Sequence, residues 1–391
     1  MSRRVWHWAI WAALAIGVPT IGWSAGRQGA VILELPHRSV RAAGMGEVFA
    51  AYEQEVSALL WNPAAIATLS RPEIHSAYNS FEKVFAEAGE GLFYWMLAWG
   101  MPLGSAGTLG ASLQLNGKGS IEVTTDSPEV VAVEDLGTDW VLSLAYADRL
   151  GSHLRFGVAA KIIRLNLGVG FEQGSSATSY ALDTGVQYAG RAGIPFSLGL
   201  SVLNVGTRIQ FKDEYQSDPL PRKFRGSLIV RPWDSNELRL LVGAEVAAAI
   251  DKLSQDRNAP DFVQTIEERL DEAAELGEES PYYGKTRKEL EDELIRQRGV
   301  GIYAFSWDRL ERSVGAELWL YDLLAIRAGY KKYDDIAEPP GLELFDRITF
   351  GLSVNGAPFG VPLVFEYANG IWGPGGPTKS RVNSFALSFV L

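Results

Sequence analysis

The chain has no cysteine among its 391 residues. This absence excludes a disulfide framework, a thiolate metal site and a lipid anchor on an N-terminal cysteine. Beyond the first 25 residues, no apolar run reaches the roughly 20 residues that a membrane-spanning helix needs. An exported chain of this kind is therefore either water-soluble or inserted into a membrane as a closed β-barrel.

Histidine is also scarce, with four residues in all. His7 lies in the leader, and His37, His75 and His153 are scattered without the spacing of a metal site, so we expect surface or rim positions for them. There is no GxSxG motif, and GKG at 117–119 is too short for a phosphate-binding loop. The net charge of −11 argues against nucleic acid as a partner. The sequence thus predicts no enzyme, no catalytic residue, no metal and no cofactor.

The N-terminus has the pattern of a secretory signal peptide. Two arginines precede an apolar stretch from about Trp8 to Val18, and small residues follow. The apolar stretch is shorter than a transmembrane anchor requires. We expect residues 1–24 to be removed, with cleavage after Ser24 favoured over cleavage after Ala25.

Glycine and aromatic residues are abundant, with 41 glycines, 12 tryptophans, 14 tyrosines and 17 phenylalanines. This composition suits strands and tight turns better than helices. Period-two alternation bounded by turn residues predicts about fourteen strands. They lie near residues 75–82, 91–101, 107–116, 139–148, 154–166, 178–189, 196–204, 223–232, 238–248, 311–320, 323–332, 346–355, 361–369 and 382–391.

The connections between these strands alternate between short and long. One edge of the sheet would therefore carry only tight turns, which is typical of outer-membrane barrels with short periplasmic turns and long extracellular loops. The predicted fold class is all-β: a closed antiparallel transmembrane β-barrel of about 14 strands over residues 73–391. The predicted location is a Gram-negative-type outer membrane, whose lipid the barrel would contact.

Each predicted strand has an apolar and a polar face. In 347–355, for example, isoleucine, phenylalanine, leucine and valine alternate with arginine, threonine, glycine, serine and asparagine. In a barrel the apolar face contacts lipid and the polar face lines the lumen. The charged residues predicted for the lumen are Arg155, Lys161, Arg225, Arg239, Glu245, Glu317, Arg327, Arg347 and Glu366.

Bases outnumber acids in this predicted lumen. Such an interior would attract an anion such as a carboxylate headgroup, or the acids Glu47, Glu53 and Glu55 of the preceding segment. Alternatively, the lumen charges satisfy one another inside the low-dielectric wall.

The stretch RAAGMGEVFAAYEQEVSALLWNPAAIA, residues 41–67, precedes all the predicted strands. A barrel of about fourteen strands encloses more space than its own side chains fill. Glycines at 44 and 46 allow close backbone approach, and Pro63 keeps Asn62 out of helical geometry. We therefore predict that residues 25–72 form a hatch inside the periplasmic half of the lumen.

Two strings in this stretch, RAAGMGEVFAA and SALLWNPAAIA, are similar to the N-terminal signature of the PorV/PorQ family, within the FadL-like superfamily of outer-membrane transporters. LSVLNVGTRIQF and LWLYDLLAIRAGYK also resemble segments of that family. This chain has Glu53 and Glu55 where the family usually has aspartates, and Ala65 where it has glycine. The hatch residues that the resemblance implies are Gly44, Gly46, Trp61, Asn62, Pro63 and Ala64.

The resemblance implies an adaptor or shuttle for type IX protein secretion, with secreted cargo proteins or secretion-machinery subunits as partners. An alternative is a FadL-like channel for long-chain fatty acids or other hydrophobic compounds, whose partner is a hydrophobic small molecule. A structural surface barrel without a transported ligand is a third possibility.

Residues 250–299 differ in composition from the rest of the chain. From 251 to 298 there are fourteen acids and eight bases, so this segment accounts for −6 of the formal −11. Apolar residues recur at helical spacing in two stripes, which predicts two amphipathic helices in an extracellular insertion. This insertion would either cap the pore and dock a partner, or form a solvated hairpin on the rim.

Overall fold

The computed structural model describes most of the chain, and the signal peptide predicted at 1–24 lies outside the described residues. The described ranges are 30–33, 35, 38–80, 92–124, 130–166, 176–211, 217–249, 260–298, 310–332, 347–371 and 381–391. Within these ranges, no helix is both long and apolar enough to span a membrane.

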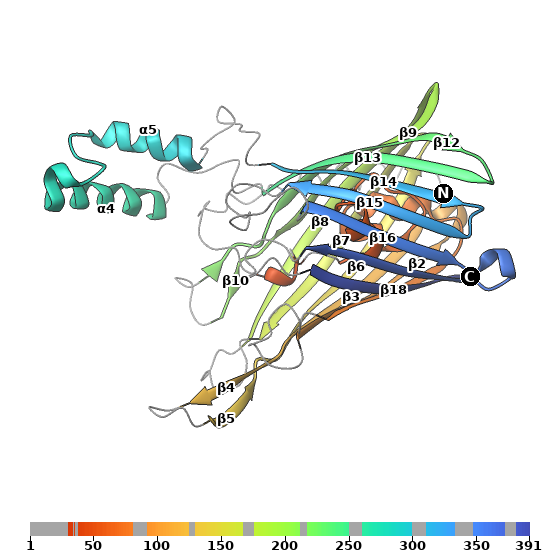
Figure 1. The fold of residues 1–391 in the computed structure, drawn as a ribbon, viewed down its shortest axis with the longest axis horizontal. Helices are drawn as coiled ribbons and strands as arrows, with labels where there is room; N and C mark the ends of the chain where they lie inside the picture. The colour runs from red at the N-terminus through yellow and green to blue at the C-terminus, as the bar shows by residue number, and fades with distance from the viewer. Residues whose placement is uncertain are drawn as a thin grey trace, which may run out of the picture. The chain divides into compact units, whose positions relative to one another are not determined.

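Fourteen strands form a closed antiparallel barrel, as the sequence predicted (Figure 1). Each strand pairs with its neighbours in chain order, and β1 pairs with β18 to close the cylinder. The strands are β1 (Glu73–Ser80), β2 (Leu92–Pro102), β3 (Thr108–Lys118), β6 (Thr138–Leu150), β7 (Leu154–Asn166), β8 (Ser176–Ala192), β9 (Ile194–Gly206), β12 (Lys223–Asp234), β13 (Leu238–Ala249), β14 (Glu311–Leu320), β15 (Leu324–Lys332), β16 (Ile348–Asn355), β17 (Leu363–Ile371) and β18 (Arg381–Val390).

Side chains alternate strictly between the two faces of the wall because the strand period is two. In β8, Tyr180 and Leu182 face outward and are about 60% exposed, whereas Ser179 and Asp183 face inward and are buried. The same alternation leaves the apolar side chains of β16, such as Phe350, exposed. An apolar exterior around a polar interior identifies a transmembrane barrel of the outer-membrane type.

One edge of the barrel carries the short connections. They include a turn at 151–153, a single residue, Gly193, between β8 and β9, a turn at 321–323, and η10 (Ala357–Phe359). Another short connection holds η4 (Gly104–Ala106). The opposite edge carries the long connections, which confirms the two-sided loop pattern on which the barrel prediction depended. In barrels of this type the short-turn edge is periplasmic.

Two small hairpins in the long connections were missed by sequence reasoning. β4 (Ser120–Thr124) pairs with β5 (Val130–Asp135). β10 (Ile209–Gln210) pairs with β11 (Ser217–Asp218). Both lie in long connections for which we predicted no strands, because they are too short to give a convincing alternating pattern.

The described residues of the N-terminal segment, 30–33, 35 and 38–72, lie within the barrel and carry the red end of the colour scale in Figure 1. It contains η1 (Val31–Leu33), α2 (Val40–Gly44), η2 (Val56–Leu60) and η3 (Pro63–Thr68). The Ser39 side chain caps α2, and the Asn62 side chain caps η3 with Pro63 at its first turn. These short helices are linked by turns, so the segment follows the curved inner wall.

The 250–299 region contributes two helices, α4 (Pro260–Leu276) and α5 (Arg287–Arg298), joined through η6 (Gly277–Glu279). They form part of a compact unit separate from the barrel unit. Ile266 of α4 packs against Leu290 and Leu294 of α5, and all three side chains are buried. The amphipathic stripes seen in the sequence thus face each other within a helical hairpin.

Candidate functional site

A belt of glycines on the inner wall receives the N-terminal segment. A Cβ atom on Gly199 would overlap the Ala50 carbonyl group, and one on Gly157 would overlap the backbone of Pro63. Glycine lets the segment approach the wall closely at these positions, with its backbone at Gly157 and Gly199 and with the Asn62 side chain at Gly185. The belt consists of Gly157, Gly185, Gly199, Gly243, Gly315, Gly329 and Gly351.

The belt runs around the short-turn half of the barrel. Gly315 pairs directly with Gly243 on one side and with Gly329 on the other, so three adjacent strands present glycine at one level. Gly157 pairs with Gly185 in the same way. Close to this level, Gly44 of α2 contacts Gly351 and Gly46 contacts Tyr330. The segment therefore follows the wall in direct backbone contact.

Asn62 and its neighbours link η3 to the wall. The Asn62 side chain accepts a hydrogen bond from the Ala64 N–H at 3.0 Å and donates to the carbonyls of Ala50 at 2.8 Å and Val186 at 3.0 Å. The Trp61 carbonyl accepts from Ser201 at 2.6 Å. Ala65 lies within η3 and needs no left-handed backbone, so its replacement of the glycine typical of the family leaves this turn intact.

Apolar side chains of the segment fill the lumen between these polar contacts. Phe49 stacks on Tyr52 and packs edge-on against Trp61, with ring centroids 4.7 and 5.3 Å apart. Phe49, Trp61 and Ile66 have no exposed surface, and they join a hydrophobic cluster with inward residues of the strands, such as Ile163 of β7. The N-terminal segment and the inward side chains of the wall therefore pack together like the interior of a folded domain.

Arg41 of α2 is the centre of a buried ion-pair network. Its guanidinium contacts Glu55 at 2.6 Å and Glu366 of β17 at 2.8 Å, and it lies 3.6 Å from Glu317 of β14. Arg327 of β15 contacts the same two strand carboxylates, at 2.5 Å and 3.4 Å. Burial raises the pKa of Glu55 to about 7, although Arg41 acts in the opposite direction.

Tyr52 extends this network. Its hydroxyl donates to Glu317 at 2.7 Å and accepts from Arg41 at 3.2 Å. Ser353 completes the wall side by donating to Glu366 at 3.1 Å and accepting from Arg327 at 2.5 Å. Every charged group of this network thus has at least one oppositely charged neighbour.

Glu53 forms a second ionic anchor. Its carboxylate pairs with Arg155 of β7 and, at 2.6 Å, with Arg231 of β12. Burial alone would raise the pKa of Glu53, but the two guanidiniums outweigh burial and hold that pKa below its ordinary value. Ion pairs therefore attach the segment to β14 and β17 through Arg41 and to β7 and β12 through Glu53.

Arg225, Glu245 and Lys161, which were also predicted for the lumen, occur in ion pairs. Arg225 contacts Glu245 at 2.7 Å, and the second oxygen of Glu245 accepts the N–H groups of Phe49 and Ala50. Lys161 contacts Asp183 at 2.6 Å, an acid that sequence reasoning did not assign to the lumen.

Two predicted residues lie nearer the ends of the lumen. Arg239 pairs with Asp322 at 3.2 Å, and both side chains are about half exposed. Arg347 directly precedes β16 and is half-buried. Neither belongs to the network around Arg41.

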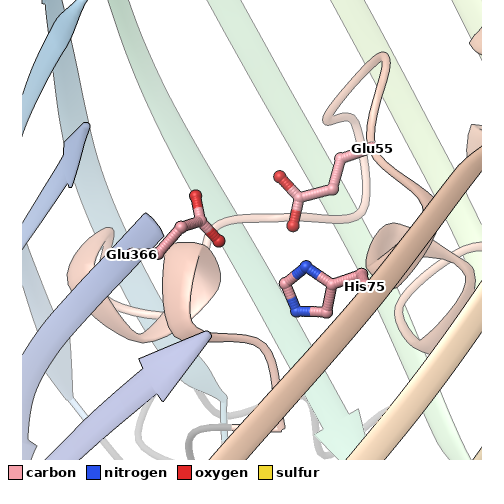
Figure 2. A group of neighbouring side chains, drawn as sticks. All are labelled: Glu55, His75 and Glu366. Carbon is pink, nitrogen blue, oxygen red and sulfur yellow. The ribbon is translucent and has the colours of Figure 1, made fainter. Parts of the chain in front are cut away.

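Three residues that could hold a metal meet beside Arg41. Glu55, His75 of β1 and Glu366 turn their ligating atoms toward one another, and one such atom of each lies within 4.8 Å of the other two (Figure 2). His75 is fully buried, so the predicted surface or rim position was wrong; the alternation of β1 places it inside. His153 is exposed, as expected, and His37 lies outside the described residues.

Sequence reasoning missed the glycine belt and the role of Arg41. Isolated glycines inside strand patterns are a known signal of close backbone approach, and they were available in every belt strand. Arg41 stands in the quoted N-terminal stretch, but nothing in that stretch indicates that two of its partners, Glu317 and Glu366, lie more than 270 residues away.

No known family model matches the chain, and no curated protein resembles it significantly in sequence. Among solved structures, it is similar to the toluene transporter TodX of Pseudomonas putida, with 11% identity, a TM-score of 0.49, and coverage of 89% of this chain and 96% of that one. The toluene transporter TbuX of Ralstonia pickettii has 12% identity, a TM-score of 0.46 and coverage of 90% and 97%. A Pseudomonas aeruginosa FadL homologue has 10% identity, a TM-score of 0.45 and the same coverage. Likeness this remote assigns no activity.

Proposed function

We propose that this protein admits small hydrophobic compounds across the outer membrane, with residues 25–72 acting as a hatch that excludes water and hydrophilic solutes. The observation that carries the proposal is the hydrophobic core inside the lumen, which includes Phe49, Trp61 and Ile66. A porin lumen is polar and water-filled. A hydrated solute would lose its hydrogen bonds to water on entering this apolar region, whereas an apolar solute would gain by leaving water.

The attachment of the hatch supports a regulated closure. Its contacts with the wall combine backbone packing on the glycine belt with the two ionic anchors at Arg41 and Glu53. A buried ion pair stabilises the hatch only while both charged partners are in place, because the loss of one partner leaves the other charge buried and uncompensated. Access for the solute would be from the long-loop side, which is extracellular in this type of barrel.

Two measurements on the full-length protein test the proposal. In planar bilayers, the intact barrel should show little ionic conductance, and a variant lacking residues 30–72 should conduct. In proteoliposomes or expressing cells, uptake of a long-chain fatty acid or a monoaromatic compound should exceed that of a non-expressing control, while a sugar of similar size should not enter faster. Equal sugar entry with and without the hatch, or no gain in uptake of hydrophobic compounds, would overturn it.

The secretion adaptor implied by the PorV/PorQ resemblance stays a prediction. It requires docking of exported proteins at the long-loop side, for which the 250–299 insertion is the largest available segment. A pull-down of the intact barrel against exported proteins would test it separately from transport.

A further inference from the structure

Three potential metal ligands from distant parts of the chain converge inside the barrel. Glu55 comes from the N-terminal segment, His75 from β1 and Glu366 from β17, and all three are buried (Figure 2). The ligating atoms are one imidazole nitrogen and two carboxylate oxygens. Zinc and related divalent transition metals bind this donor set in proteins.

Several polar atoms of this group have unused bonding capacity. Nε2 of His75 and Oε2 of Glu366 are buried and have no hydrogen-bond partner among the described residues. The other oxygen of Glu366, Oε1, accepts hydrogen bonds from Arg41, Arg327 and Ser353. These bonds hold the carboxylate in position, and Oε2 stays available to a ligand. Buried polar atoms in native proteins normally have a partner, and a bound ion is one such partner.

The charge balance also favours a cation. Arg41 contacts Glu55, Glu317 and Glu366, and Arg327 contacts the last two. Glu73 adds a fourth buried carboxylate, which accepts the N–H of Val56, the residue after Glu55. With all four carboxylates ionised, these four acids and two guanidiniums carry a formal charge of minus two, which one divalent ion would neutralise. An uncompensated charge of this size is costly in a dry interior.

We propose that Glu55, His75 and Glu366 bind one divalent transition-metal ion. Metal–ligand bonds of about 2.0–2.2 Å would draw the three ligand atoms to roughly 3.3 Å from one another. From at most 4.8 Å this is a small movement for two glutamates with rotatable side chains. Ser388 of β18 lies beside the group, with its hydroxyl 2.7 Å from Nδ1 of His75, and orients the ring.

The ion would join the N-terminal segment to the place where the barrel closes. β18 pairs with β1 on one side and with β17 on the other, so His75 and Glu366 flank the last strand of the chain. A metal bound to both strands and to Glu55 would cross-link the N-terminal segment, the first strand of the barrel and the strand before the last. This role does not depend on which compound the barrel transports.

Metal content of the full-length barrel tests this directly. The protein is purified in detergent with a tag that contains no histidine, loaded with Zn²⁺, dialysed, and measured by inductively coupled plasma mass spectrometry. We expect about one Zn²⁺ per chain, and at least a tenfold weaker Zn²⁺ affinity in His75→Gln and Glu366→Gln. His153→Gln, which changes an exposed histidine, should keep wild-type binding.

Less than about a tenth of an equivalent of Zn²⁺ in the loaded wild type would overturn the proposal. Unchanged binding in a folded His75→Gln variant would also overturn it. Gel mobility of unheated samples reports whether each variant folds. If the variants fail to fold, the visible absorption spectrum of Co²⁺ loaded into the wild type provides the test. Ligand-field absorption typical of a low-symmetry nitrogen and oxygen site would support the proposal. The spectrum of hydrated Co²⁺ would contradict it.

Discussion

Gly315 of β14 lies so close to Met45 that a Cβ atom at position 315 would overlap the Met45 carbonyl group. At this position the wall and the N-terminal segment therefore meet backbone to backbone. Packing of this kind depends on glycine at the wall, because any larger residue requires one backbone to move. A substitution at Gly315 therefore tests the attachment of the segment without altering any charge.

Replacing Gly315 with valine should displace the N-terminal segment while the barrel remains closed. Strand residues outside the contact are unaffected, and valine is itself well suited to strands. We expect a rise in single-channel conductance and faster proteolysis between residues 41 and 67. Gly226→Ala is the matched control, since its Cβ atom would meet only ordinary contacts, the nearest at 3.4 Å. Wild-type conductance in Gly315→Val would mean that the segment does not close the lumen.

Asn62→Ala should weaken the same attachment by removing hydrogen bonds. The variant loses the cap of η3 and removes one donor from the part-buried Val186 carbonyl and one from the buried Ala50 carbonyl, which keeps a bond from Gln187. Loss of a cap costs about 1 kcal/mol, and each buried group left unsatisfied costs about 1–3 kcal/mol. We expect the segment to be released from the lumen at a lower midpoint temperature, which limited proteolysis at increasing temperature measures.

Asn355→Ala serves as the comparison for Asn62. Asn355 also donates to a carbonyl, that of Asp322 at 2.9 Å, but at an exposed turn where water can replace the bond. Equal effects of the two substitutions would show that burial of the Asn62 contacts is unimportant.

The sequence predicted the barrel well because every strand repeats the same local signal. Alternation and loop length are properties of neighbouring residues, so all fourteen strands and both edges could be assigned without coordinates. The contacts inside the lumen are different. Arg41 meets Glu366 across 325 positions, and His75 meets Glu55 only because the N-terminal segment folds back along the wall. Pairing at such separation is set by the three-dimensional path of the chain, which no local pattern specifies.

Acidification should loosen the anchor at Glu53. Because its pKa is lowered in the folded protein, this carboxylate contributes stability above its ordinary pKa, and the contribution is lost as pH falls through the lowered value. Conductance should therefore rise when the pH is taken below about 4.5, the ordinary value for glutamate. Glu53→Gln should conduct more at neutral pH and lose most of this acid response. An identical pH profile in the two proteins would assign the response to other groups.

Arg41→Gln should release the N-terminal segment more completely than Asn62→Ala does. The change leaves Glu55 without its arginine partner and Glu366 with the weaker ion pair to Arg327 at 3.4 Å and the hydrogen bond from Ser353. Removing one partner of a buried ion pair costs about 3–5 kcal/mol, because the remaining charge stays buried. We expect high conductance at neutral pH and a large fall in the thermal midpoint of segment release. Adding Glu55→Gln to this variant removes the stranded carboxylate and should recover part of the loss, which a double-mutant cycle measures as a coupling energy. No coupling between the two substitutions would mean that Arg41 and Glu55 do not stabilise the segment as a pair.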